Sequence, residues 1–330
     1  MRLIFTSLIL ILLLSCSNKD ISTVETKTYI DEVLKTVEEN SIRVNMVDFA
    51  KIKRKAYAKL RRANTIKKCH PIVESILEDL GDRHSFLLPK EEVDKWLSTS
   101  KTSTISDIIT FKGKLLDQNI GYIHMEGFGS GDSISIQQYA DSLQNLIKSI
   151  DNINIKGWIL DLRENNGGNC WPMLTGLGPL LGDGVCGYFI GSNQSKTAWV
   201  YKDGAAKEDS TVQARLSINH YDLIKDSNPI AVLTGNYTAS SGEIVTTAFC
   251  NKSNSKSFGE STMGLSTAND EFRLSDGSMI FLTISTYADR KGNIFGHEIE
   301  PNQKVSFSYK SIGSSEDSVI KKAIEWIEKK

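Results

Sequence analysis

The chain has 330 residues, with 39 lysines and arginines against 40 aspartates and glutamates, so its net charge is close to zero. This balance argues against a nucleic-acid partner, which would favour a strongly basic surface. The length suffices for one large α/β domain and a small accessory domain. Cys69, Cys170, Cys186 and Cys250 lack the paired spacing of a zinc site. The sequence therefore predicts no metal and no cofactor.

The first sixteen residues are typical of an exported lipoprotein. Arg2 supplies a positive charge, residues 8–14 form an apolar run, and Ser15 precedes Cys16. The run is too short for a comfortable transmembrane helix, which favours a signal peptide over residues 1–16. Its end resembles a bacterial lipobox, which implies cleavage before Cys16 and lipidation of its sulfur, with an ordinary signal peptide or a short anchor as the alternative. Ser17 is similar to the residue that directs lipoproteins to the outer membrane.

These features predict a protein that a lipid holds on a membrane of the bacterial cell envelope, facing the periplasm or the cell surface. The compartment is oxidising, so Cys170 and Cys186 could form a disulfide. Buried free thiols are an equally good interpretation, and the sequence leaves both open.

Residues 17–104 are predicted to form an N-terminal helical domain followed by a linker. Apolar residues recur at helical spacing over 29–37, 49–60 and 72–80. Gly81 is placed to end the third helix. A short helix is expected over 90–96, and the polar run 98–104 indicates the linker.

Residues 105–330 alternate strand and helix patterns, which favours an α/β domain with a largely parallel sheet. Strands are expected over 108–116, 120–124, 157–162, 186–190, 197–201 and 229–235. Helices are expected over 133–150, 172–181, 243–249 and 318–327. A hairpin is expected over 272–284, because Asp276-Gly277 is a turn dipeptide between two apolar runs.

The run 238–243, Thr-Ala-Ser-Ser-Gly-Glu, lies between a predicted strand and a predicted helix. Enzymes of the α/β class place nucleophiles at such turns, because the helix N-terminus offers unpaired N–H groups and the positive end of a dipole. Ser240 and Ser241 are the candidates. The alternative is a simple N-cap, since serines begin many helices.

A serine nucleophile needs a base and donors for the developing oxyanion. Of the five histidines, His84 stands out because it lies in a loop just past a predicted helix end, and His297 is the second choice. Gly167-Gly168 ends a buried strand, at the sheet edge where open α/β sheets bind ligands. Paired glycines there can turn backbone N–H groups toward a ligand.

Together these segments resemble the C-terminal processing (tail-specific) serine peptidases, and more closely the branch that includes the tricorn core protease. The matching blocks, in family order, lie at 80–85, 121–123, 157–168, 229–243, 258–260, 274–277 and 299–301. The resemblance implies a ClpP/crotonase-like α/β core with Ser240 as nucleophile. It also implies an oxyanion hole built from the N–H of Ser241 and one from the Gly167-Gly168 turn.

The chain departs from the family pattern at the base. Leu265 occupies the position of the lysine that many members use, whereas His84 matches the histidine of the tricorn-like branch. Arg83 stands where that branch has a serine before the histidine. The resemblance also implies a late acidic residue that orients the histidine, for which Glu298 is near the right place and Asp289 is an alternative.

The stretch between His84 and Gly121 is too short for the PDZ domain of many members. The resemblance therefore implies a lipid-anchored serine endopeptidase of the cell envelope that cleaves polypeptides without that tethering module. The alternative is a catalytically inactive protein that binds peptides or small hydrophobic molecules on the same fold, because a fold does not guarantee an activity.

Overall fold

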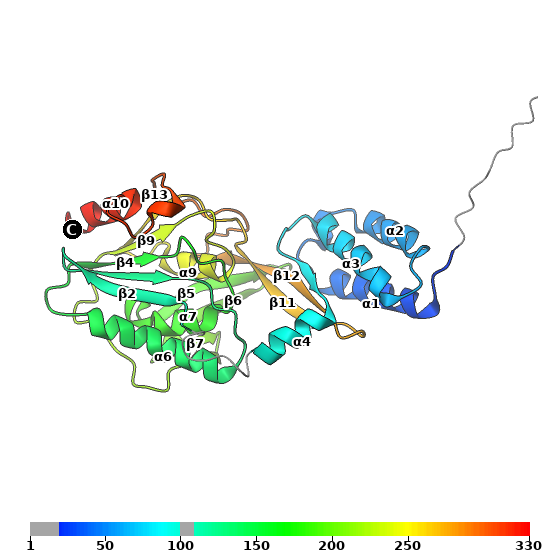
Figure 1. Cartoon of the computed structure of the whole chain (residues 1–330), viewed down its shortest axis with the longest axis horizontal. Helices are drawn as coiled ribbons and strands as arrows, with labels where there is room; N and C mark the ends of the chain where they lie inside the picture. Colours follow the sequence, from blue (N-terminus) through cyan, green and yellow to red (C-terminus); the bar gives the residue numbers. More distant parts are fainter. Residues whose placement is uncertain (1–19, 100–108) are drawn as a thin grey trace, which may run out of the picture.

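The computed structural model describes residues 20–99 and 109–330, and the predicted signal peptide with Cys16 lies outside them (Figure 1). The N-terminal helices, within residues 24–80, gather at one end of the molecule and two β-sheets at the other, with a hairpin over residues 267–288 reaching between them (Figure 1). Within the described ranges, no helix has the length and the apolar character needed to cross a membrane.

The N-terminal helices form as expected from their apolar spacing. They are α1 (Val24–Asn40), α2 (Phe49–Leu60), α3 (Ile66–Leu80) and α4 (Lys90–Thr99), with a 3-10 turn at Val44–Met46. Gly81 ends α3 in the left-handed conformation (φ 73°), as predicted, because glycine adopts positive φ without a steric penalty. Tyr29, Val33 and Val73 are buried between the first three helices.

The helical region shares its apolar core with the C-terminal half of the chain. Leu274, Ile280 and Leu282 of the hairpin belong to the same buried cluster as α1–α3. The hairpin consists of β11 (Thr267–Arg273) and β12 (Met279–Ala288), and β1 (Phe86–Leu88) pairs antiparallel with β12. The division at residue 104 stays a prediction, and the hairpin is the element that joins the two regions in space.

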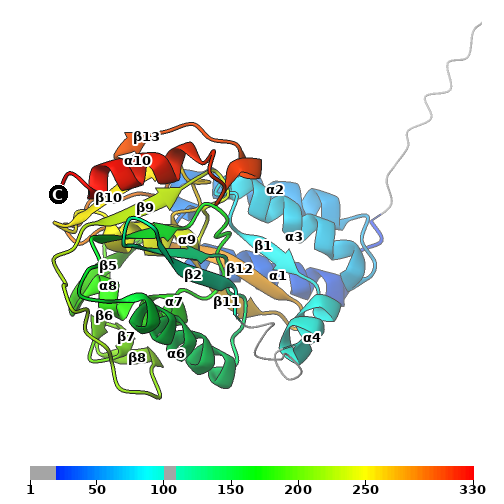
Figure 2. The ribbon, with the colours of Figure 1, turned by 60° about the vertical axis from the view of Figure 1, so that its left-hand side comes forward.

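The central sheet is parallel except at one edge, as the alternating pattern predicts. Its strand order is β13 (Gln303–Lys304), β10 (Ser255–Gly259), β9 (Ile230–Thr234), β4 (Gly157–Asp161), β3 (Ile120–Met125) and the antiparallel β2 (Phe111–Leu116). One face packs on α6 (Ser133–Ile150), α7 (Cys170–Gly176), α8 (Gly178–Leu181) and α9 (Ser241–Phe249). The other face packs on α10 (Ser318–Ile327), so α10 and α6 lie on opposite sides in Figure 2.

A second, antiparallel sheet was not predicted. It has the order β1-β12-β5-β6-β7-β8, with β11 beside β12, and adds β5 (Gly184–Gly191), β6 (Lys196–Lys202), β7 (Ala205–Glu208) and β8 (Thr211–Arg215). The short, polar β7 and β8 carry too little alternation to be read from sequence. The predicted helix over 172–181 is divided at Leu177, and its second part begins at Gly178, where a Cβ would lie 1.9 Å from the Tyr201 ring of β6.

Candidate active site

Ser240 lies at the turn between β9 and α9, in a conformation that side-chain-bearing residues rarely adopt (φ 49°, ψ −115°). Such strain persists only where surrounding bonds impose it. Here the Ala239 N–H donates to the Asn165 carbonyl at 2.9 Å, and Thr238 Oγ1 donates to the Leu162 carbonyl at 2.8 Å. The turn is therefore fixed to the loop that follows β4.

The buried carboxyl group of Glu243 fastens the same turn from the other side. It accepts hydrogen bonds from the Ser240 N–H (2.9 Å), Thr262 Oγ1 (2.5 Å) and the Gly264 N–H (3.0 Å). Burial raises the pKa of Glu243 to about 7, and these donors offset part of that rise. The Ser240 N–H is thus occupied within the protein and is not available to a substrate.

The Gly167-Gly168 turn lies directly against Ser240. A Cβ built on Gly167 would come within 2.8 Å of the Ser240 Cβ, and both glycines have positive φ, 109° and 106°. The Gly167 N–H donates to Asn165 Oδ1 at 3.1 Å. In contrast, the N–H groups of Gly168 and Ser241 have no hydrogen-bond partner in the part of the chain that the structure describes. The Ser241 hydroxyl donates to the Gly168 carbonyl, which ties these two donors together.

His84 lies in the loop between α3 and β1 and is partly buried. Its Nδ1 forms a hydrogen bond with Thr267 Oγ1 at 2.8 Å, and Asn269 Nδ2 donates to its carbonyl at 2.7 Å. Burial lowers the pKa of His84 to about 4, so the ring is neutral at physiological pH. Among the described residues, no hydrogen bond joins His84 to Ser240.

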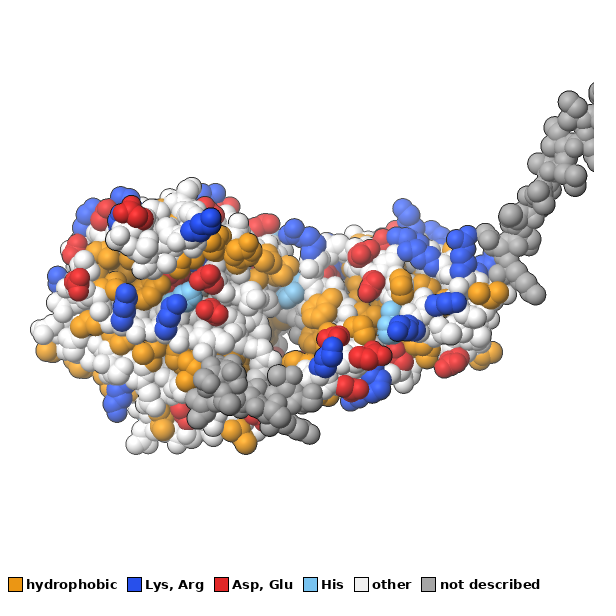
Figure 3. Space-filling model, viewed as in Figure 1, with side chains coloured by type: hydrophobic (Ala, Val, Ile, Leu, Met, Phe, Trp, Pro, Cys, Tyr) orange, Lys and Arg blue, Asp and Glu red, His pale blue; other side chains and the backbone are white. Residues whose placement is uncertain are grey.

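One short segment, residues 262–267, contacts both halves of this constellation. The Met263 N–H donates to the Thr238 carbonyl at 2.8 Å, and the Gly264 N–H donates to Glu243. Three residues later, Thr267 holds His84. The structure therefore brings the predicted base to the segment that fastens the nucleophile turn. The face of the molecule drawn in Figure 3 is hollowed between its two ends.

The geometry agrees with the comparison against protein families. The model of peptidase family S41 matches residues 119–305, more than half of the chain. The chain belongs to peptidase family S41. The predicted resemblance to C-terminal processing peptidases is confirmed. The predicted α/β fold is confirmed as well, because the solved photosystem II D1 C-terminal processing protease shares it.

Several proteins resemble this S41 chain over much of its length. It is 28% identical over 300 residues to the nisin-resistance protein of Lactococcus lactis subsp. lactis. The aligned region covers 91% of this chain and 86% of that protein. It is 28% identical over 196 residues to the carboxy-terminal processing protease CtpA of Bacillus subtilis (strain 168), but spans only 37% of it. Its fold superposes on a lipoprotein from Streptococcus agalactiae with a TM-score of 0.74, at 25% identity and with 92% and 96% of the two chains covered.

Neither carboxylate that the S41 resemblance suggested forms a hydrogen bond or an ion pair with His84 among the described residues. Glu298 is half-exposed and lies 3.7 Å from the Arg83 guanidinium, a surface ion pair. Asp289 is buried and accepts from Asn251 Nδ2 (2.5 Å) and Asn293 Nδ2 (2.8 Å), which stabilises the turn after β12. The group that is bonded to the His84 ring is the Thr267 hydroxyl instead.

Two buried groups complete the surroundings of Ser240. Tyr287 on β12 is 1% exposed, and burial raises the pKa of its hydroxyl well above the usual value. The nearby Ser240 side chain offsets part of that rise, and no motif in the sequence marks this neighbour. Cys170 lies beside Ser241 at the start of α7, and its thiol is free, as is that of Cys186. The structure thus selects free thiols over the disulfide.

The second-choice base His297 is exposed, and its Nδ1 is bonded to the Glu298 carbonyl at 2.8 Å.

Proposed function

We propose that the chain is a serine endopeptidase that hydrolyses peptide bonds of polypeptides through Ser240. The observation that carries this proposal is the strained Ser240 turn packed against Gly167, with two free backbone donors on its neighbours Gly168 and Ser241. A serine that merely capped a helix would gain nothing from positive φ or from free donors beside it. Membership of a peptidase family supports the same assignment.

In the proposed reaction, Ser240 Oγ attacks the peptide carbonyl and His84 takes its proton. A hydrogen bond from Nδ1–H to Thr267 would leave Nε2 as the acceptor facing the site, and burial keeps that nitrogen neutral. Catalytic hydrogen bonds often tighten only when substrate binds, so we propose that the contact between His84 and Ser240 closes at that step.

The developing oxyanion would be held by the N–H groups of Gly168 and Ser241. Each such donor contributes about 3 kcal/mol to the transition state in measured enzymes. The Gly167 N–H is already bonded to Asn165, so of the two glycines Gly168 is the better donor. The histidine then protonates the leaving amine, and water repeats the cycle on the acyl-enzyme.

The substrates and the location are part of the same proposal. One relative that matches this chain over most of its length is a nisin-resistance protein, so nisin is the first polypeptide to test as a substrate. We propose that Cys16 carries a lipid that anchors the chain in the cell envelope, on the outer membrane where the cell has one. A structural neighbour that is itself a lipoprotein supports this anchor.

The Ser240→Ala variant tests the nucleophile. We expect it to lose turnover of unfolded polypeptides and of nisin, and to lose labelling by a fluorophosphonate probe. Ser210→Ala, at an exposed turn between β7 and β8, is the matched control and should keep both. Unchanged labelling and turnover in Ser240→Ala would refute the proposal.

A non-catalytic binding protein is the second candidate, and one observation favours it. His84 forms no hydrogen bond with Ser240, and no carboxylate among the described residues is bonded to its ring. If the chain only binds peptides, calorimetry should detect peptide binding of equal strength in the wild type and in Ser240→Ala. Neither protein would then react with the probe.

A further inference from the structure

The segment 307–317, which precedes α10 and which we call the strap, contacts the turn that carries Ser240. The Tyr309 hydroxyl donates to Asn236 Oδ1 at 2.7 Å, and the Tyr237 N–H donates to the Tyr309 oxygen at 3.2 Å. The rings of Tyr237 and Tyr309 lie 4.6 Å apart. Tyr309 therefore fixes both the backbone and a side chain of the residues three and four positions before the nucleophile.

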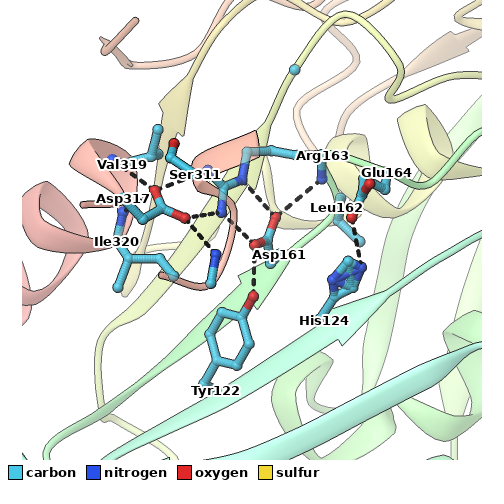
Figure 4. Close-up of polar contacts among 12 residues, drawn as sticks. Tyr122, His124, Asp161, Leu162, Arg163, Glu164, Ser311, Asp317, Val319 and Ile320 are labelled. Carbon is cyan, nitrogen blue, oxygen red and sulfur yellow. Dashed lines mark hydrogen bonds and ion pairs between the residues drawn. The ribbon is translucent and has the colours of Figure 1, made fainter. Parts of the chain in front are cut away.

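The other end of the strap contacts the loop that carries the predicted oxyanion donors. Figure 4 shows Arg163, which follows β4, between Asp161 and Asp317. Its Nη2 donates to Asp161 Oδ2 at 2.6 Å and to Asp317 Oδ2 at 2.7 Å, and all three side chains are fully buried. Tyr122 donates to Asp161 at 2.8 Å. Most charged residues in loops are exposed to solvent, but Arg163 is buried and paired with two carboxylates.

Aromatic contacts join the two ends. The guanidinium of Arg163 lies 4.8 Å from the centre of the Phe307 ring, and that ring lies 5.0 Å from the Tyr309 ring. A cation held over an aromatic face is attracted to it, most strongly where water is excluded. The contacts therefore run without a break from the Arg163 loop, through the strap, to the Ser240 turn.

Helix α10 would stay in place without the hydrogen bonds of the Tyr309 hydroxyl. The helix already buries Val319, Ala323 and Ile327 against the central sheet. Asp317 also caps it, accepting from the N–H groups of Val319 and Ile320. The hydroxyl of Tyr309 adds little to that packing, because it points to the loop after β9 instead. The hydrogen bonds of the Tyr309 hydroxyl therefore hold the turn that carries the nucleophile, not α10.

We propose that the strap is a positioning element for the active site, with Tyr309 holding the Ser240 turn and Asp317 holding the Arg163 loop. Two loops that end different strands must keep a fixed separation if the attacking oxygen and the oxyanion donors are to face one substrate carbonyl. Small misplacements of such groups lower rates strongly. The inference rests on the proposed peptidase function, but the holding of the turn can be measured without it.

The test is Tyr309→Phe, which removes one hydroxyl and keeps the ring. Tyr221→Phe is the matched control, because the Tyr221 hydroxyl also donates to a single acceptor, Asp151, at 3.0 Å, remote from the site. We expect kcat on a peptide and the rate of fluorophosphonate labelling to fall ~10-fold in Tyr309→Phe, with KM within twofold of wild type. The melting temperature should change no more than in the control.

Hydrogen–deuterium exchange supplies a readout that does not depend on activity. The amide of Tyr237 loses its acceptor in Tyr309→Phe and should exchange ~10-fold faster or more, whereas in the control it should not change. Equal exchange and equal kinetics in the two variants would overturn the inference. If the wild-type protein proves inactive, the proposed function fails, and the exchange rates alone still decide whether the strap holds the turn.

Discussion

The two halves of the candidate site are built in different ways. The nucleophile half consists of neighbours in sequence, since Ser240, Ser241 and Glu243 share one turn and the first turn of α9. The base half is assembled from distant segments, because His84 precedes β1 while its partner Thr267 begins β11, 183 positions later. The first half places its reacting groups within one turn, which bonds from the loop after β4 and from residues 262–264 hold in place, whereas the second depends on how the hairpin joins the two ends of the molecule.

This difference indicates where activity can be controlled. Changes in the nucleophile half should act directly on the chemistry, because its atoms are fixed to one another. Changes in the base half should act on how often His84 reaches Ser240. The predictions below test that contrast, beginning with the largest effect.

Gly167→Ala should cause the largest loss. The new Cβ would lie 2.8 Å from the Ser240 Cβ and 3.2 Å from the Ala239 carbonyl, at a φ of 109° that alanine rarely adopts. We expect kcat/KM to fall ~100-fold or more, because the oxyanion turn must move away from the nucleophile. Gly182→Ala also has positive φ (69°) but open space around it, so it should cost stability without costing activity. Equal kinetics in the two variants would show that Gly167 has no role in positioning.

The pH dependence should separate the two halves. A pKa of about 4 keeps His84 neutral at pH 5, where a histidine of pKa ~6.5 would be only about 3% neutral, so activity there should be ~30-fold higher than for an ordinary base. Glu243, with a pKa of about 7, titrates separately, and a second acid limb near pH 7 in the kcat/KM profile of the wild type would report its protonation. We expect kcat/KM of Glu243→Gln to keep a single acid limb near pH 4. An acid limb at pH 6.5 in both proteins would contradict the buried, neutral base.

The same shift affects stability, with a definite sign. The folded-state pKa of His84 is depressed, so the unfolded chain takes up a proton first as the pH falls. The contribution of His84 to stability is therefore complete above pH 6.5 and is lost as the pH falls toward 4. Activity at low pH has to be measured beside circular dichroism, so that unfolding is not mistaken for titration of the base.

The contrast also explains what the sequence could predict. The strand–turn–helix around Ser240 and the glycine that ends α3 before His84 depend on local spacing, so they were predictable. Thr267 as the ring partner of His84 was not, because it depends on the pairing of β11 with β12 and of β12 with β1. Tyr287 was missed for the same reason, since a tyrosine in a buried strand carries no signal of which atom it faces.

Thr267→Val tests the base half with an intermediate effect. Valine fills the same space but cannot bond the His84 ring, so the ring loses the contact that fixes its orientation and tautomer. We expect kcat to fall ~10-fold with KM little changed. Thr286→Val is the control, because Thr286 lies opposite Thr267 in the hairpin register and its side chain has no hydrogen bond to the site. A loss of equal size in Thr286→Val would mean that the hairpin, not the hydroxyl, matters.

The smallest effect is expected for Glu298→Gln, and it decides which residue orients the base. An exposed ion pair such as Glu298 with Arg83 is worth about 0–1 kcal/mol, so the variant should keep kcat within twofold and its melting temperature within about 2 °C. If Glu298 instead swings to His84 when substrate binds, kcat should fall at least ~10-fold while the resting protein stays equally stable. Arg83→Gln removes the same ion pair from the other side and leaves the carboxylate free to reach the ring. Loss in Glu298→Gln with full activity in Arg83→Gln would identify Glu298 as the orienting acid, whereas full activity in both leaves that role to the Thr267 hydroxyl, a neutral partner suited to a histidine held neutral by burial.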